Sequence, residues 1–293
     1  MMMDDEIFDK YCQAGAFAAS VIRKGAMEIR VGTPYLEVIE FIEDLASSDE
    51  SGLAFPLNVS LNEDAAHDTA STGDERVFAS GDLVKLDLGI HFDGYIADTA
   101  ITIDLGNNGL LVDASRAALS RAIEKVRPGV TVGELGSAIQ TEIESRGYRP
   151  VANLTGHGLG RFVVHQPPSI PNIAVQGGAV LEEGMVFAIE PFATTGSGHV
   201  NEKRRVEIFQ QISRKPVRLA TARKILEAVS GRQGMPFAKR WLPDTRPDIA
   251  LTTLIHSGVL HAFPVLSDIP GSLVSQHEHT VIVTEDHCVV TTA

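Results

Sequence analysis

Two aspartates lie in neighbouring apolar segments that are separated by a turn signal. Asp87 falls in the segment 82–90 and Asp98 in the segment 95–104, with Asp93-Gly94 between them. Asp-Gly between apolar runs is a strong β-hairpin signal, so we expect both segments to be strands. Across a tight turn here, odd positions of the first strand face the same side as even positions of the second. The two carboxylates are therefore predicted to project together, where they either share a proton or hold a cation.

Two glutamates repeat this pattern in the second half of the chain. Glu190 lies in the apolar run 185–192, and Glu278 precedes the apolar run 281–283. A single acid in a strand is most often a structural or surface residue. Four acids within four strands are hard to explain in that way, because each would lose its hydration on burial. We therefore interpret the two aspartates and the two glutamates as candidate metal ligands.

A histidine between glycines is the fifth candidate ligand. His157 lies in the segment 155–160, which we expect to be a loop whose glycines let the backbone come close and leave the imidazole free. A His-Gly pair is weak evidence alone, but four convergent carboxylates make a ligand the better interpretation. Five such groups are too many for one zinc ion. They suit two divalent ions bridged by carboxylates, and the oxygen-rich set favours Mn, Fe, Co or Zn.

The two halves of the chain resemble each other, which predicts a duplicated α+β unit with a site between the halves. His67 and His165 lie 98 residues apart and are candidate partners in this repeat. The other matches are Ile29-Arg30-x-Gly32-x4-Glu37-x4-Ile42 with Val126-Arg127-x-Gly129-x4-Glu134-x4-Ile139, Gly81-x5-Asp87 with Gly184-x5-Glu190, and the segment that begins at Asp98 with the one that begins at Glu278.

The elements that position these residues follow from hydrophobic periodicity. Apolar residues at helical spacing predict helices, and short apolar runs predict strands. The predicted helices are 4–30, 35–47, 113–126 and 133–146, and further strands are predicted at 160–165, 185–190, 278–284 and near the C-terminus.

The second half contains an additional segment. The offset between matched positions rises from 103 at Glu190 to 180 at Glu278, which implies about 77 extra residues. Helical patterns occur there at 218–230, 236–242 and 247–258. Twelve Lys or Arg against three acids fall between Lys203 and Arg246. These cations either form solvated helical faces or dock on ribosomal RNA or a nascent chain.

Composition narrows the class of protein. The chain has 293 residues, 44% of them hydrophobic, and a net charge of −13, which argues against broad nucleic-acid binding and against DNA as a partner. Two cysteines imply no disulfide framework and favour a reducing compartment, so we expect a cytoplasmic location. Because the start has no basic region followed by an apolar stretch, and no run of 18 apolar residues occurs, we expect neither a signal peptide nor a membrane span.

Several motifs resemble those of type II methionine aminopeptidases, in particular the archaeal branch, and the resemblance covers nearly the whole chain. It implies the pseudo-two-fold α+β fold called pita bread, formed here by residues 1–201 and 256–293, with a helical insertion at 202–255 that is typical of type II. The motifs are Ala54-Phe55-Pro56, Asn62-x3-Ala66-His67, Gly156-His157-Gly158-x3-Phe162-x2-His165-x2-Pro168-x-Ile170-Pro171-Asn172, Ile189-Glu190-Pro191-Phe192, Phe237-Ala238-Lys239-Arg240-Trp241-Leu242 and Glu278-His279-Thr280.

The resemblance also implies roles for single residues. His67 and His165 flank the scissile bond, and Glu190 moves the proton of the attacking water. Phe55, Phe263 and His165 line the pocket for the methionine side chain. The metal ligands are Asp87, Asp98, His157, Glu190 and Glu278, of which Asp98 and Glu278 bridge two ions. One departure is His277, which stands where relatives often have an aromatic residue and leaves the shape of the pocket open.

The resemblance predicts an enzyme that removes the initiator methionine from nascent polypeptides with a small second residue. Two bound metal ions generate the attacking hydroxide, and the enzyme is expected to be a monomer. One alternative is a proline-specific dipeptidase or a creatine-cleaving relative of the same fold. Another is a non-catalytic relative that binds RNA or protein, although such relatives usually lose metal ligands. Metal storage is a further alternative, which the two non-ligand histidines at the site disfavour.

Overall fold

The centre of the molecule is a nine-stranded antiparallel sheet. The computed structural model describes residues 3–47, 51–243 and 247–293. The strand order is β1-β4-β5-β15-β9-β7-β8, with β2 also paired to β4 and β16 to β15. The bounds are β1 Ser51–Leu53, β2 Asn58–Leu61, β4 Leu83–Phe92, β5 Tyr95–Asp104, β7 Thr155–Gly160, β8 Val163–Pro171, β9 Val186–Ile189, β15 Glu278–Val283 and β16 Cys288–Val290.

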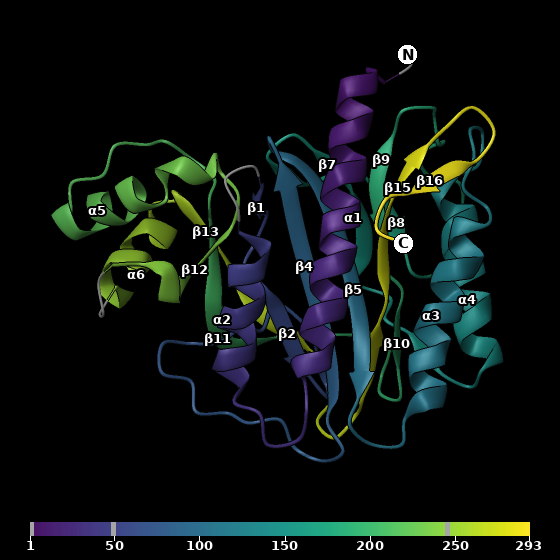
Figure 1. Ribbon diagram of the computed structural model, residues 1–293, viewed down its shortest axis with the longest axis horizontal. Coiled ribbons are helices and arrows are strands. Elements are labelled where there is room, and N and C mark those ends of the chain that lie inside the picture. The colour runs from purple at the N-terminus through teal and green to yellow at the C-terminus, as the bar shows by residue number, and fades with distance from the viewer. Residues whose placement is uncertain (1–2, 48–50, 244–246) are drawn as a thin grey trace.

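Four helices pack on this sheet. Helix α1 crosses in front of β4 and β5 in Figure 1, and α3 and α4 lie side by side over the other half of the molecule. The helices α1 and α2 can pack closely because residue 25 is a glycine. A Cβ at this position would lie 2.5 Å from the Ile42 side chain. Among the described residues, no helix is both long and apolar enough to cross a membrane. The bounds are α1 Asp5–Glu28, α2 Tyr35–Ala46, α3 Gly109–Ile123 and α4 Val132–Ser145.

The arrangement of these elements confirms the predicted duplication. Helices α1 and α2 precede β4 and β5, while α3 and α4 precede β9 and β15, and the four strands meet in the order β4-β5-β15-β9. Equivalent backbone bonds recur in the two halves. Gly32 N–H donates to Phe78 O at 2.7 Å, and Gly129 N–H donates to Leu181 O at 2.9 Å. Both glycines have positive φ, +89° and +87°, which explains why glycine stands at this position of each repeat.

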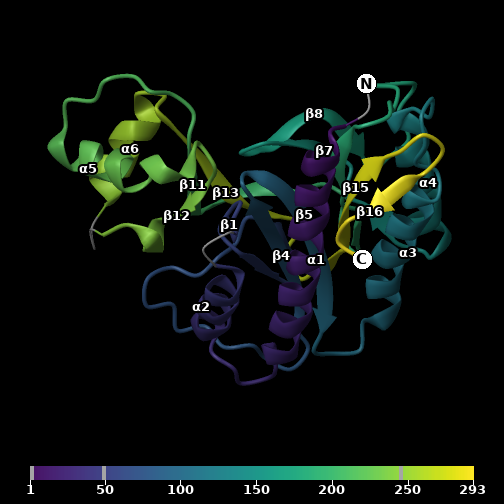
Figure 2. The same ribbon diagram turned by 45° about the horizontal axis from the view of Figure 1, so that its top comes forward.

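A second lobe forms beside the main sheet. Figure 2 shows α5 and α6 well to one side of α1, connected through the strands β11 and β13. These strands pair with each other, and β12 and β3 complete a four-stranded sheet; a separate three-stranded sheet has the order β14-β10-β6. The bounds are β3 Asp64–Ala66, β6 Arg149–Pro150, β10 Phe192–Thr194, β11 Asn201–Gln211, α5 Ala220–Ala228, β12 Phe237–Ala238, α6 Asp248–His256, β13 Leu260–Ser267 and β14 Val274–Gln276.

Three expectations about local structure are wrong, one in this lobe and two in the glycine-rich segment around His157. The predicted helix at 236–242 is a short strand, β12, followed by a 3-10 turn at Lys239–Trp241, because burial of Phe237 against β11 outweighs the helical pattern. The expected loop at 155–160 is strand β7, and the expected strand at 160–165 contains the turn between β7 and β8. Glycine permits the close approach: a Cβ at Gly156 would lie 2.3 Å from Ala188 O.

The segment expected to be the insertion, 202–255, begins within β11 and includes α5 and most of α6. Residues 244–246 of it, among them Asp244 and Arg246, lie outside the described residues. Its apolar core is shared by β11, α5, α6 and β13, through residues such as Phe209, Ile225, Leu254 and Leu260. The strands that flank the helices therefore join this lobe to the main domain.

Candidate metal centre

All nine residues that the sequence singled out line one cavity of about 220 Å³. Three of the acids and one histidine lie on strands of the central sheet, and the fourth acid, Glu190, follows directly after β9. The remaining four residues come from the segment after β1, from the residue after β3, from β8 and from β13. The nine are Phe55, His67, Asp87, Asp98, His157, His165, Glu190, Phe263 and Glu278.

The strand register explains why the four acids meet. Asp87 on β4 is opposite Ala100, and Asp98 on β5 is opposite Gly89, so both aspartates face the same side of the hairpin. The turn at Asp93-Gly94 has positive φ at both residues, +50° and +85°, as the hairpin signal indicates. The predicted parity of this hairpin is thus confirmed.

The two glutamates arrive from the second repeat. Glu278 is the first residue of β15 and is also opposite Ala100, which brings it beside the aspartate hairpin. Glu190 follows directly after β9, whose last residue, Ile189, is opposite His279 on β15. The four carboxylates therefore face one another across the junction between the two halves of the fold.

The imidazole of His157 completes the group. Its Nε2 atom lies 3.8 Å from Asp98 Oδ2 and 3.5 Å from Glu190 Oε1. One donor atom each from Asp98, His157 and Glu278 lie within 4.8 Å of one another. The Oδ1 atoms of Asp87 and Asp98 are buried and have no hydrogen-bond partner among the described residues. Buried carboxylate oxygens without donors are suited to divalent cations, so this donor set fits metal ions.

Hydrogen bonds behind the ligands fix their backbone. Asp98 N–H donates to Thr280 Oγ1 at 2.7 Å, and this hydroxyl donates to Asp98 O at 2.9 Å. The hydroxyl of Thr99 donates to Glu278 O at 3.0 Å. Two threonines, one from each repeat, therefore fasten β5 to β15 at the point where the carboxylates meet. Such support is typical of sites in which ligands must be oriented before a metal binds.

The ionised form of the four buried carboxyl groups is unfavourable without a nearby positive charge. Burial raises the pKa of Asp87 to about 7. Burial is the main cause that raises the pKa values of Asp98, Glu190 and Glu278 well above their ordinary values. The neighbouring carboxylates raise these pKa values further. Burial lowers the pKa of His157 to about 3, which keeps its ring neutral and able to ligate. Full ionisation of this group therefore requires a multivalent cation.

Two further imidazoles stand at the cavity wall around the ring of Phe263. The ring centroid of His67 lies 5.3 Å from that of Phe263, and His67 Nδ1 lies 3.3 Å from Pro264 O. His165 stacks at 6.4 Å from Phe263 and lies 4.2 Å from the ring of His157. Burial and the neighbouring His165 lower the pKa of His67 to about 4. His67 is therefore a neutral hydrogen-bonding group at neutral pH.

Sequence reasoning missed several residues of the wall. Ile208 on β11 and Pro236 before β12 bring the second lobe into the cavity, and Asn58 on β2 is opposite Asp87. Asn58 is 5% exposed, and its Oδ1 atom has no hydrogen-bond partner among the described residues. Its position as a polar residue between the apolar Leu57 and Val59 could have marked Asn58 as a candidate site residue. Nothing in the local sequence distinguishes Ile208 or Pro236 from ordinary core residues.

The cavity and its donors agree with what sequence comparison shows. Residues 9–285 match the model of metallopeptidase family M24. The chain belongs to this family. Methionine aminopeptidases are among its relatives: that of Archaeoglobus fulgidus is 49% identical over 99% of this chain and 100% of its own length. That of Methanothermobacter thermautotrophicus is 43% identical over 98% and 99%. This M24 peptidase is thus similar over its full length to archaeal methionine aminopeptidases.

Solved structures confirm the predicted fold. A methionine aminopeptidase from Thermotoga maritima superposes with a TM-score of 0.74 at 24% identity, covering 100% of this chain and 98% of that one. A prolidase from Pyrococcus horikoshii gives 0.65 at 20% identity, covering 100% and 63%. A thermophilic Arx1 gives 0.86 at 18% identity, covering 99% and 91%. At these identities the three show the fold of the M24 peptidase and nothing about its substrate.

Proposed function

We propose that this M24 peptidase is a type II methionine aminopeptidase of the archaeal branch. It removes the N-terminal methionine from polypeptides whose second residue is small. The observation that carries the proposal is the convergence of four carboxylates and one imidazole on a cavity that also has two further histidines and three phenylalanines in its wall. Full-length similarity to archaeal methionine aminopeptidases supports it.

Five residues would hold two divalent ions, Mn, Fe, Co or Zn. The ligands are Asp87, Asp98, His157, Glu190 and Glu278, and Asp98 and Glu278 from the two central strands are the proposed bridges. The unpartnered Oδ1 atoms of both aspartates support this assignment. Bound divalent ions supply Lewis acidity and lower the pKa of water to about 7.

The protein groups around the donors would manage protons and charge. Glu190 borders the cavity and lies 3.5 Å from His157 Nε2, so it can accept a proton from the attacking water and return it to the leaving amine. His165 would donate an N–H to the developing oxyanion. A proton on His67 Nδ1, donated to Pro264 O, leaves Nε2 to accept from the scissile amide N–H.

The aromatic wall would select the methionine side chain. Phe55 and Phe263 line the cavity together with Ile208 and Pro236. A thioether is polarizable and packs well at aromatic edges, whereas a charged side chain would lose its hydration in such a wall.

Replacing His165 with alanine is expected to lower kcat by about 10²–10³-fold, because one oxyanion donor is lost. Replacing His67 with alanine is also expected to slow turnover. Neither side chain is a proposed ligand, so metal content measured by elemental analysis should not change. His199→Ala is the matched control, since that imidazole is exposed and outside the cavity. Wild-type turnover in a folded, metal-loaded His165→Ala enzyme would remove the residue from the mechanism.

The proposed setting is the cytoplasm, where a monomer acts on nascent polypeptides. The segment rich in Lys and Arg between Lys203 and Arg246 is also proposed to contact the ribosome transiently. Several of its cations already have partners within the chain: Lys203 pairs with Asp64, Arg205 with Asp68 and Arg240 with Glu43. Within the described part of this segment, the exposed cations without an ion-pair partner are Arg204, Arg214, Lys215, Arg218, Arg223 and Lys224.

The deciding experiment measures peptide cleavage by metal-stripped protein supplied with Mn, Fe, Co or Zn. Release of methionine from a Met-Ala-Ser peptide, and its absence without metal, is the expected result. A Met-Leu-Ser peptide tests the small second residue and should be cut poorly. Preferential cleavage of a Leu-Pro dipeptide would instead identify a proline-specific dipeptidase. Folded protein that cuts none of the peptides with any metal would contradict the proposal.

A further inference from the structure

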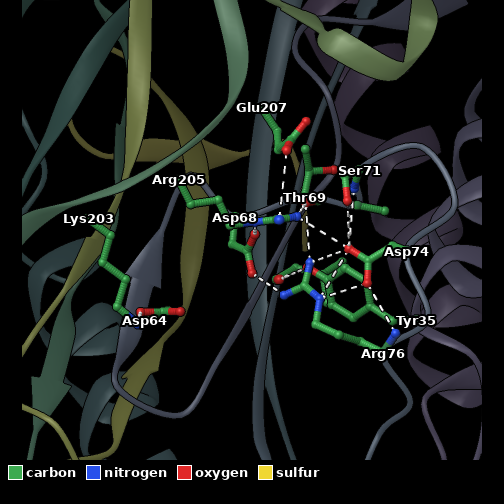
Figure 3. A network of polar contacts seen from close by, with 12 residues as sticks. Tyr35, Asp64, Asp68, Thr69, Ser71, Asp74, Arg76, Lys203, Arg205 and Glu207 are labelled. Carbon is green, nitrogen blue, oxygen red and sulfur yellow. Dashed lines mark hydrogen bonds and ion pairs between the residues drawn. The ribbon is translucent and has the colours of Figure 1, made fainter. Parts of the chain in front are cut away.

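The chain segment that follows His67 is held by buried ion pairs, drawn in Figure 3. Asp68, the next residue, is 1% exposed. Its carboxylate accepts hydrogen bonds from Arg76 Nη1 at 2.6 Å and from Arg205 Nε at 2.9 Å. Arg205 Nη2 also reaches the carbonyl oxygen of Thr69 at 2.8 Å. Two guanidinium groups thus fix both the side chain and the backbone of the two residues after His67.

The ion pairs continue to Asp74. Arg76 bonds both carboxylate oxygens of Asp74, and Arg205 Nη2 lies 3.3 Å from Asp74 Oδ2. Hydrogen bonds from Arg76 outweigh the effect of burial and lower the pKa of Asp74 to about 2. Arg76 also stacks 3.9 Å above the ring of Tyr35, which anchors it to α2. The segment from Asp68 to Asp74 is therefore bound to α2 on one side and to Arg205 on the other.

Arg205 reaches this segment from the second lobe. It lies on β11, 137 residues from Asp68 along the chain. A second arginine of the same lobe continues the attachment: Arg240 Nη1 donates to Thr69 Oγ1 at 3.0 Å and to Ala70 O at 3.2 Å. Figure 3 shows Arg205, with Lys203 and Glu207 of the same strand, on the opposite side of the cluster from Tyr35 and Arg76. These two arginines of the lobe thus make contacts within the chain.

His67 needs such support because its backbone is strained. Its φ is +65°, in the left-handed region that residues with a side chain rarely occupy. Strained residues persist where the surrounding structure over-determines them, and they cluster at functional sites. The preceding residue, Ala66, is opposite Leu266 on β13, and the oxygen of Asp68 accepts from Val59 N–H at 2.8 Å. The backbone is fixed on both sides of the strained residue, and the charged contacts lie on its C-terminal side.

We propose that Arg205 is a positioning residue for His67. Through Asp68 and Thr69 it holds the strained backbone, and so directs the imidazole toward the substrate amide. The second lobe thereby sets the geometry of a substrate-binding histidine through an arginine that does not itself line the cavity. This inference rests on the function proposed for His67 in methionine release.

The test is Arg205→Lys, which keeps the positive charge and loses the planar fork of donors. Displacement of a positioned group by about 1 Å can cost up to 10²-fold in rate, so we expect kcat on a Met-Ala-Ser peptide to fall about 10- to 100-fold. Metal content should be unchanged, because no ligand is touched. Arg204→Lys is the matched control on the neighbouring, exposed position and should behave as wild type. Wild-type kcat in Arg205→Lys, or loss of metal from it, would overturn the proposal.

A double-mutant cycle separates positioning from general damage. In a His67→Ala background, Arg205→Lys should cause no further loss of kcat, because the imidazole through which it acts is gone. An equal fold-loss in both backgrounds would show a general structural effect and would refute the proposal. Asp68→Asn, which keeps the shape of the side chain and removes its charge, should behave like Arg205→Lys in both backgrounds.

A readout without turnover distinguishes this inference from the proposed function. The His67 imidazole signal in an NMR spectrum, assigned by its absence in His67→Ala, should shift in Arg205→Lys and stay in place in Arg204→Lys. An unmoved signal in Arg205→Lys would overturn the positioning role whatever the enzyme cleaves. If wild-type protein releases no methionine and the signal nevertheless shifts, the proposed function fails and the structural coupling stands.

Discussion

Replacing Asp98 with asparagine is expected to lower kcat/KM for a Met-Ala-Ser peptide by about 10³-fold or more. Asp98 is a proposed metal ligand, and a neutral amide binds a cation more weakly than a carboxylate does. Metal ions contribute several kcal/mol of transition-state stabilisation, of which each ~1.4 kcal/mol corresponds to tenfold in rate. Elemental analysis of the purified variant should show less than the wild-type metal content. The hydrogen bond from Asp98 N–H to Thr280 Oγ1 involves the backbone and is kept in the variant, so we expect the strand itself to be unchanged.

The matched control is Asp93→Asn. This aspartate lies at the turn of the same hairpin, where it pairs with Lys10 and Arg161 outside the cavity. Asparagine is well tolerated at its positive φ of +50°. The control makes the same change of charge and should keep full activity and metal content. Equal activity and metal content in Asp98→Asn and wild type would exclude Asp98 as a ligand.

Replacing Asp87 with asparagine is expected to stabilise the metal-free protein increasingly as the pH rises from about 4 to about 7. Burial raises the pKa of Asp87 in the folded protein to about 7, above its ordinary value near 4. In this interval the folded state binds the proton more tightly than the unfolded state does. The contribution of this group to stability is therefore full at low pH and is lost as the pH rises through the folded pKa.

The expected size of this effect is up to about 1.4 kcal/mol for each pH unit of the interval. The measurement is the free energy of unfolding by urea, for EDTA-treated wild type and variant, at several pH values. Subtracting wild type from variant removes the terms from His67, His157 and Lys85, whose pKa values are lowered by burial in both proteins. A difference that stays constant with pH would contradict the raised pKa of Asp87.

Metal loading should reverse the order of stability. Bound cations favour the ionised carboxylates, so wild type gains stability from metal, and more at higher pH where the ligands are deprotonated. Asp87→Asn loses a proposed ligand and should therefore gain less stability from metal. At higher pH the four buried acids therefore destabilise the metal-free protein most, and at the same pH they are expected to bind metal best. This loss of stability is the expected cost of keeping four buried acids for function.

Local patterns were sufficient where one interaction dominates. The hairpin at Asp93-Gly94 has a period of two and a defined turn, so the relative orientation of Asp87 and Asp98 followed from counting residues. Matched glycines predicted the duplication. Gly32 and Gly129 both have a positive φ, which residues with a side chain rarely adopt, so glycine stands at the same position of each repeat. The roles of the individual site residues stay predictions, although the structure brings all nine of them to one cavity.

Local patterns failed where a distant partner decides. Residues 236–242 have a helical pattern, yet Phe237 pairs with Phe209 on β11 and is 1% exposed. The segment 155–160 has a composition typical of loops, and it is a strand because the neighbouring backbones β8 and β9 approach its glycines closely. Propensity is a weak prior, and tertiary packing outweighs it in both places.

The sequence by itself determined the chemistry of this protein: its donor types, their alternation in strands and the duplication that brings two pairs of acids together. Only the tertiary structure decided what surrounds them. It places Ile208 and Pro236 in the cavity wall, and it directs Arg205 onto Asp68 beside His67. The physical reason is one of range. Periodicity and turns record contacts between near neighbours, whereas an ion pair across 137 residues leaves no periodic trace in either segment.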